Sequence, residues 1–204
     1  DGRIAITVKG IEGGKLSQYL CHEARIGEVL ELGAAFGDMT LPERLDGRWL
    51  FLAAGSGITP LMAMVRTLAA QAMPVPLDLI YWARNREELC FAAELRALAT
   101  AHANFNVHFV LTREAELIQG ESSGRIDRAL IDSLLDDADE RHVFACGPGG
   151  FVDTARSLFS ATAPTFRGGA SASALQVPAS STFVDSTTSV SSRRPSARIR
   201  RGRK

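Results

Sequence analysis

The sequence predicts an α/β protein in which a parallel sheet is covered by helices. From residue 49 onward, short apolar runs alternate with stretches of helical periodicity. Two of these runs, 49–54 and 142–146, lead directly into glycine-rich turns. Apolar runs of this length that end in glycine are typical of buried parallel strands. With 204 residues, 46% of them hydrophobic, the chain can bury a substantial core.

The strand–helix repeat assigns the elements of this domain in order. We predict strands at 49–54, 77–83, 106–112 and 142–146, and helices at 60–72, 86–100, 127–136 and 149–159. Strands that alternate with helices of this length form a parallel sheet with right-handed crossovers. Residues 48–159 are therefore expected to form one compact α/β domain.

Residues 1–47 follow a different pattern. Residues 3–9 and 28–32 alternate between apolar and polar side chains, as half-buried strands do, and residues 15–22 have the spacing of a short helix. With a strand-and-turn stretch at 33–42, they predict the C-terminal part of a small antiparallel β-barrel. Because the chain starts without methionine in mid-strand, we expect its true N-terminus to be missing.

Residues 160–204 are predicted to be a disordered basic tail. Ser, Thr, Ala and Gly dominate this stretch without periodicity, so it cannot bury enough apolar surface to offset its ordering entropy. The tail carries eight basic residues against one acidic residue, whereas the rest of the chain carries 15 against 22. Clustered arginines bind nucleic acid, but the acidic body and the lack of aromatic residues near these arginines argue against that partner.

Composition also bears on cysteine chemistry, metals and membranes. The three cysteines, Cys21, Cys90 and Cys146, lie far apart, which predicts neither a zinc site nor a disulfide framework. Reduced thiols favour a cytoplasmic protein. The four histidines lack metal-ligand spacing, and no apolar run reaches about 18 residues without a breaker, so we expect no membrane span.

The glycine turns form the candidate ligand site. Gly55 and Gly57 would let a pyrophosphate approach the backbone, and Thr59 adds a hydroxyl at a helix start, where the dipole favours negative charge. Cys146 ends a strand at the same crevice, where its thiol would pack against a flat nicotinamide ring. A buried structural cysteine is the alternative, and a nucleophile is the weaker option. Open α/β sheets hold dinucleotides in such a crevice.

Four motifs, in order along the chain, resemble the ferredoxin–NADP reductase family, and specifically the reductases of bacterial oxygenases and desaturases. The motifs are GGKLSQYL at 13–20, GDMTLP at 37–42, GSGITP at 55–60 and CGPGGF at 146–151. The resemblance covers about residues 1–159. Two features depart from the family: the flavin signature Arg-x-Tyr-Ser/Thr is absent, and no Cys-x4-Cys-x2-Cys iron–sulfur module follows residue 159.

The resemblance implies a flavin-binding barrel followed by a nicotinamide-nucleotide domain. The implied activity passes electrons from NADPH or NADH through a flavin, FAD in preference to FMN, to an iron–sulfur centre or a ferredoxin-like acceptor of an oxygenase or desaturase. Two further hypotheses remain open: a nucleotide- or nucleic-acid-binding module without redox activity, and an inactive fragment. Because half of the barrel is expected to be missing, we predict that this chain binds flavin poorly.

The resemblance also implies roles for individual residues. It places Lys15, Leu16 and Ser17 at the flavin phosphates, and makes Cys146 and Thr59 the candidate catalytic residues. The residues implied to contact the nicotinamide coenzyme are Gly55, Gly57, Thr59, Cys146, Gly147 and Pro148. Thr112 and Arg113 would hold the 2′-phosphate of NADPH, because an arginine fork suits a phosphate dianion. Arg84 and Arg86 would add positive charge at the same edge, which favours NADPH over NADH.

Overall fold

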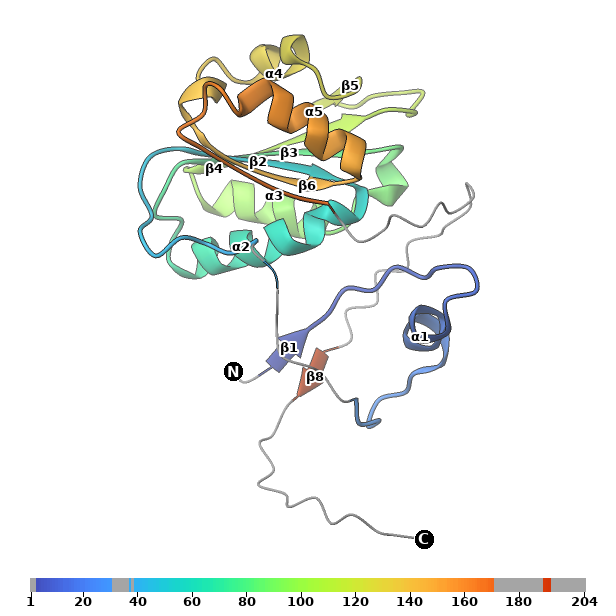
Figure 1. The fold of residues 1–204 in the computed structure, drawn as a ribbon. Helices are drawn as coiled ribbons and strands as arrows, with labels where there is room; N and C mark the ends of the chain where they lie inside the picture. Colours follow the sequence, from blue (N-terminus) through green and yellow to red (C-terminus); the bar gives the residue numbers. More distant parts are fainter. Residues whose placement is uncertain (1–2, 31–36, 38, 171–188, 192–204) are drawn as a thin grey trace, which may run out of the picture.

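The computed structural model describes residues 3–30, 37, 39–170 and 189–191, and its centre is a six-stranded sheet in which every neighbouring pair is parallel (Figure 1). The strand order is β5-β4-β3-β2-β6-β7. The strands are β2 (Trp49–Ala54), β3 (Leu77–Ala83), β4 (Phe105–Leu111), β5 (Glu121–Ser123), β6 (His142–Gly147) and β7 (Thr165–Ala170). The predicted α/β fold class is confirmed, and the four predicted strands are found within one residue of their expected ends.

Helices cover both faces of the sheet (Figure 1). One face is covered by α2 (Ile58–Ala70) and α3 (Ala92–Ala101), and the other by α4 (Arg128–Leu134) and α5 (Gly149–Phe159). The predicted helix at 86–100 is interrupted: a 3₁₀ turn, η3 (Arg86–Glu88), precedes α3. The interruption occurs because Phe91, at the start of α3, adopts a left-handed conformation with φ of 60°.

The core lies in two layers, one on each side of the sheet. Phe51, Leu79 and Phe144 contribute to the layer under α2 and α3, whereas Leu52 and Ile80 contribute to the layer under α4 and α5. Side chains alternate between faces along a strand, so continuous apolar runs are needed when both faces are covered. This requirement explains why the central strands were recognisable in the sequence.

The strand β7 corrects the prediction for residues 160–204. It lies inside the segment expected to be disordered, yet it pairs with β6 over six residues, from Thr165 opposite His142 to Ala170 opposite Gly147. The sheet therefore continues beyond residue 159. This edge strand contains two glycines and is largely exposed, so it lacks the apolar run that marks a central strand. The remaining tail residues, 171–188 and 192–204, lie outside the described residues.

Among its described residues, the N-terminal segment forms fewer strands than predicted. The expected strand at 3–9 is formed only as β1 (Arg3–Ala5), which pairs antiparallel with β8 (Ser189–Ser191), a second part of the predicted tail. Residues 28–30 form no strand, and 31–36 and 38 lie outside the described residues. The predicted helix at 15–22 is found as α1 (Lys15–Gln18) and the π-helical turn η1 (Tyr19–Glu23).

No helix among the described residues combines the length and the apolar character that a membrane crossing requires.

A buried ion-pair network lies at the amino ends of the strands. The side chain of Arg141 forms an ion pair with Asp78 at the start of β3, with Nη1 and Oδ2 2.6 Å apart. The same guanidinium pairs with Asp137 through Nε, at 2.7 Å. This network joins β3 to the turn η4 (Ala138–Glu140) that leads into β6.

Candidate functional site

The two glycine turns meet at the carboxyl edge of the sheet. The 3₁₀ turn η2 (Gly55–Gly57) joins β2 to α2, and Gly55 has a φ of 54°, which residues with a side chain rarely adopt. A Cβ atom at Gly57 would overlap the carbonyl group of Cys146 and lie 2.6 Å from the Gly147 nitrogen. The prediction that the two turns lie together is confirmed, and this approach is possible only because position 57 has no side chain.

A buried tyrosine holds the first turn in place. The Tyr81 hydroxyl donates a hydrogen bond to the Gly55 carbonyl oxygen at 3.1 Å and accepts one from the Cys90 N–H at 3.2 Å. Burial raises the pKa of Tyr81 well above its usual value. The phenol therefore stays protonated and remains available as a donor to the turn.

Thr59 lies in the first turn of α2, the helix that covers the face of the sheet on which Cys146 is buried. The Thr59 hydroxyl donates to the Ser56 carbonyl oxygen at 3.0 Å, so it closes the first turn of α2. Cys146 is a buried free cysteine in the core layer under α2 and α3. Burial raises the pKa of its thiol, an effect opposed by the Gly147 N–H. A neutral, buried thiol is a packing surface, and it is a poor nucleophile.

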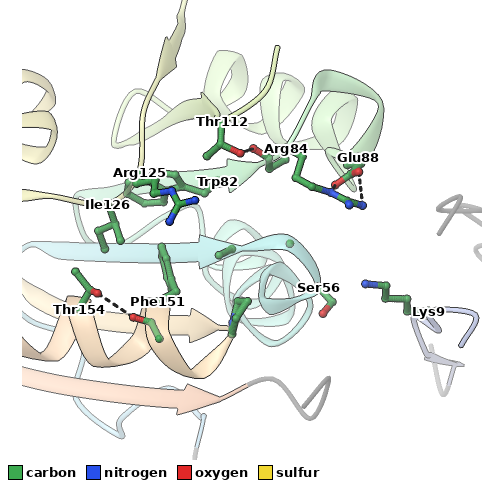
Figure 2. Close-up of a pocket in the computed structure, with 15 residues that line it drawn as sticks. Lys9, Ser56, Trp82, Arg84, Glu88, Thr112, Arg125, Ile126, Phe151 and Thr154 are labelled. Atoms are coloured by element: carbon green, nitrogen blue, oxygen red, sulfur yellow. Dashed lines mark hydrogen bonds and ion pairs between the residues drawn. The ribbon is translucent and has the colours of Figure 1, made fainter. Parts of the chain in front are cut away.

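A cavity of about 490 Å³ opens beside the Gly55 turn (Figure 2). It lies at the carboxyl ends of β2 and β3 and at the start of α5. Four of the residues that the sequence predicted for the site line this cavity: Gly55, Arg84, Thr112 and Pro148. The structure therefore brings together residues from four separate strand ends, as a dinucleotide site in an open α/β sheet requires.

The arginines at this edge differ in their partners. Arg84 lines the cavity, but its guanidinium forms a two-point ion pair with Glu88, at 2.6 and 2.9 Å. Arg86, which the sequence grouped with Arg84, instead pairs with Glu121 at the start of β5, at 2.7 Å, and donates to the Glu116 carbonyl oxygen in the preceding loop. This ion pair opposes the expectation that Arg86 supplies charge to a coenzyme phosphate, and that expectation stays a prediction.

Thr112 and Arg113 directly follow β4, and Thr112 lines the cavity. The Thr112 hydroxyl donates to the Ala83 carbonyl oxygen at 3.3 Å, and the Arg113 N–H donates to the Arg84 carbonyl oxygen at 2.7 Å. Both side chains are exposed. Within the part of the chain that the structure describes, no side chain pairs with the Arg113 guanidinium, so this charge is available to an anion.

The cavity also contains residues that the sequence analysis missed. Trp82 and Phe151 form its apolar wall, with ring centroids 5.3 Å apart and ring planes at 63°. Arg125, directly after Gly124, extends its side chain over this wall in Figure 2. No described residue pairs with the Arg125 guanidinium. Two features of the sequence could have indicated these residues: Trp82 lies near the end of a buried strand, and Arg125 directly follows a glycine in a turn.

The residues implied to hold flavin phosphates lie in a different part of the molecule. Ser17 lies inside α1, where its hydroxyl donates to the Gly14 carbonyl oxygen at 3.2 Å and accepts from the Ile11 N–H at 3.1 Å. Lys15 and Leu16 are exposed. None of the three lines the cavity; from this segment Lys9 does, with its amine directed toward Ser56 in Figure 2.

Comparison with known proteins agrees with this geometry. The chain is 33% identical over 164 residues to an NADPH oxidoreductase of Mycobacterium tuberculosis, covering 80% of this chain and 41% of that protein. It is 34% identical to the ferredoxin reductase component of 3-ketosteroid-9-alpha-monooxygenase from the same species, covering 79% and 42%. The chain thus spans about two fifths of the length of these relatives.

A solved structure and a family model complete the comparison. The flavohemoglobin of Malassezia yamatoensis, solved with bound FAD and heme, superposes with a TM-score of 0.55 at 29% identity, over 66% of this chain and 35% of that one. The family model described as the oxidoreductase NAD-binding domain matches residues 51–157, more than half of the chain. This chain therefore belongs to the oxidoreductase NAD-binding domain family of ferredoxin–NADP reductase-like proteins.

Proposed function

We propose that this chain is the nicotinamide-coenzyme-binding part of a flavin-dependent reductase that serves an oxygenase system. The observation that carries the proposal is the contact of Gly57 with Cys146 and Gly147 beside a cavity at the strand ends. The names of the relatives support it, because one is an NADPH oxidoreductase and another a reductase component of a monooxygenase.

The described residues fit a nicotinamide dinucleotide. The turn Gly55–Gly57 offers bare backbone at the N-terminus of α2, where the helix dipole favours a pyrophosphate. Cys146 and Gly147 lie on one side of this turn, where the nicotinamide ring would pack. Pro148, the residue after Gly147, lines the cavity, and this cavity leaves room for the adenosine half of the coenzyme.

Bound NADPH or NADH would supply a hydride, and bound FAD would accept it and release single electrons to an iron–sulfur or ferredoxin-like acceptor. The protein's own part is positioning. The buried, protonated thiol of Cys146 offers the nicotinamide a non-basic surface that does not compete for the hydride. Thr59 orients the first turn of α2.

We further propose that Lys15, Leu16 and Ser17 bind the flavin phosphates. We also propose that the reaction takes place in the cytoplasm.

We propose NADPH as the preferred coenzyme. Thr112 and Arg113 stand together after β4, and the Arg113 guanidinium pairs with no described residue. A planar guanidinium binds a phosphate dianion through two parallel hydrogen bonds. Arg84 contributes positive charge at the same rim, although Glu88 neutralises most of it. Arg113 is therefore the residue that distinguishes the 2′-phosphate from a ribose hydroxyl.

The experiment that tests the binding function is isothermal titration of the full chain with NADPH. We expect saturable binding at one site per chain, with competition by NADH, and no comparable binding of GTP at the same concentrations. A single-stranded DNA oligonucleotide serves as the second control. If DNA binds and NADPH does not, the chain is a nucleic-acid-binding module and the proposed function fails.

A further inference from the structure

The end of β3 carries a polar atom that the fold leaves unused. Trp82 is 4% exposed, and its indole Nε1 is buried without a hydrogen-bond partner among the described residues. Buried side-chain donors are nearly always paired, so an unpaired one calls for an explanation. The other tryptophan of the chain, Trp49, shows the usual state: its indole donates to the Asp46 carbonyl oxygen at 2.7 Å.

The position of Trp82 supplies the explanation. Its side chain belongs to the core layer under α4 and α5 and lines the cavity of about 490 Å³, together with Phe151 and Ile126. These side chains form a mostly apolar wall that suits a flat aromatic ring better than a phosphate. Arg125 is the exposed, unpaired side chain over this wall, so it can move aside without breaking an ion pair (Figure 2).

The two halves of a nicotinamide dinucleotide would reach different layers. Cys146 belongs to the layer under α2 and α3, whereas Trp82 belongs to the opposite layer, and the turn Gly55–Gly57 lies between them at the strand ends. A pyrophosphate at this turn would direct the nicotinamide toward Cys146 and the other base toward Trp82. That base is adenine, whose ring nitrogens are hydrogen-bond acceptors.

We propose that the indole N–H of Trp82 donates a hydrogen bond to a ring nitrogen of the coenzyme's adenine, which makes Trp82 a specificity-determining residue of the adenosine subsite. This proposal rests on the proposed function. Binding would require Arg125 to shift so that the adenine can reach the wall that Trp82 and Phe151 form. The buried donor then gains the acceptor that the ligand-free fold does not supply.

The test uses the two indole N–H signals in a ¹⁵N-correlated NMR spectrum of the full chain. We expect saturating ADP, and NADPH itself, to move the Trp82 signal downfield while the Trp49 signal stays in place. Nicotinamide mononucleotide should leave the Trp82 signal unmoved, because it lacks the adenine. W82F and W49F each assign the two signals, and either variant alone suffices if the other does not fold.

A binding measurement adds a second readout. W82F should weaken ADP binding by about five- to tenfold, the size of one hydrogen bond made in a dry site, and leave nicotinamide mononucleotide binding unchanged. If NADPH binds but its Trp82 signal does not move, or if W82F binds ADP as tightly as the wild type, this inference is overturned and the proposed function stands. If NADPH does not bind at all, both are overturned.

Discussion

At the scale of single residues, ion pairing decides which arginines can serve a coenzyme. Arg84 and Arg86 are both at the strand ends, but Glu88 and Glu121 already pair with their guanidinium groups. Only a charge without an internal partner gains a full new interaction when a phosphate arrives. Among the described arginines at this edge, Arg113 and Arg125 meet that condition, and Arg113 is the one that directly follows β4.

The first prediction concerns Arg113→Ala. We expect NADPH affinity to fall about 10- to 100-fold, because a hydrogen bond to a charged group contributes roughly 1.5–3 kcal/mol, while NADH affinity changes little. Titrations of both coenzymes measure the effect. Arg156→Ala is the matched control, because Arg156 is an exposed arginine that lies over Phe166, away from the cavity. Equal losses for NADPH and NADH would remove Arg113 from the 2′-phosphate site.

At the scale of elements, the unit β2–η2–α2 positions the site because neighbouring strands constrain its turn. The contact between Gly57 and β6 holds the turn from one side, and the Tyr81 hydroxyl on β3 holds it from the other. Both contacts involve backbone atoms, so the geometry of the turn depends on the register of three adjacent strands. Phosphate-binding turns need this rigidity, because a displaced turn loses its alignment with the ligand.

The second prediction concerns Tyr81→Phe. Loss of the hydroxyl leaves the Gly55 carbonyl and the Cys90 N–H without this partner, so we expect the free energy of unfolding to fall by about 1–3 kcal/mol. NADPH affinity should fall as well, because the turn is no longer held. Denaturant unfolding and coenzyme titration measure the two effects.

Tyr19→Phe is the matched control for this variant. Tyr19 is the other tyrosine of the chain, and its hydroxyl bonds to the Glu28 carboxylate in an exposed position of the N-terminal segment. The control should leave stability and coenzyme affinity nearly unchanged. If Tyr81→Phe is equally silent, the hydroxyl does not hold the turn.

At the scale of the whole molecule, the two ends of the sheet have different roles. The carboxyl end holds the glycine turns and the cavity, with arginines left unpaired for a ligand. The amino end holds Asp78, which accepts from Arg141 and from His108, whose Nε2 lies 3.2 Å from Oδ1. The charged side chains of this network are thus paired with one another, and they contribute to the stability of the fold.

The third prediction concerns Asp78→Asn and pH. Burial alone raises the pKa of Asp78, but the hydrogen bond from His108 and the Arg141 charge outweigh it and hold the pKa below its usual value. A lowered folded-state pKa stabilises the fold above the unfolded pKa of about 3.9, and this contribution is lost as the pH falls through the folded-state value. Asp78→Asn should therefore destabilise the protein by about 3–5 kcal/mol at neutral pH.

Unfolding curves at several pH values measure this effect. The difference between wild type and Asp78→Asn should shrink as the pH falls below about 4. Coenzyme affinity of the folded variant should stay unchanged, because Asp78 lies at the opposite end of the sheet from the site. Asp132→Asn is the control: its exposed pair with Arg128 should contribute only about 0–1 kcal/mol.

The sequence by itself determined the α/β class, the four central strands and the family. These features depend on local signals: apolar runs of strand length, helical periodicity, and glycines at turns. The proximity of Gly57 and Cys146 followed as well, because the ends of adjacent parallel strands lie at one edge. The edge strand β7 was missed because its largely exposed side chains carry no such pattern.

Only the tertiary structure decided which charges are free and which groups line the cavity. Glu121 is 35 residues from its partner Arg86 along the chain. The Trp82 ring in β3 contacts the Phe151 ring in α5. Ion pairs and buried donors depend on contacts between segments distant in the chain, which composition and periodicity do not encode. The general chemistry of the site, including the candidate Arg113, is therefore local, whereas the pairing of Arg86 and the places of Arg125 and Trp82 in the cavity are properties of the folded chain.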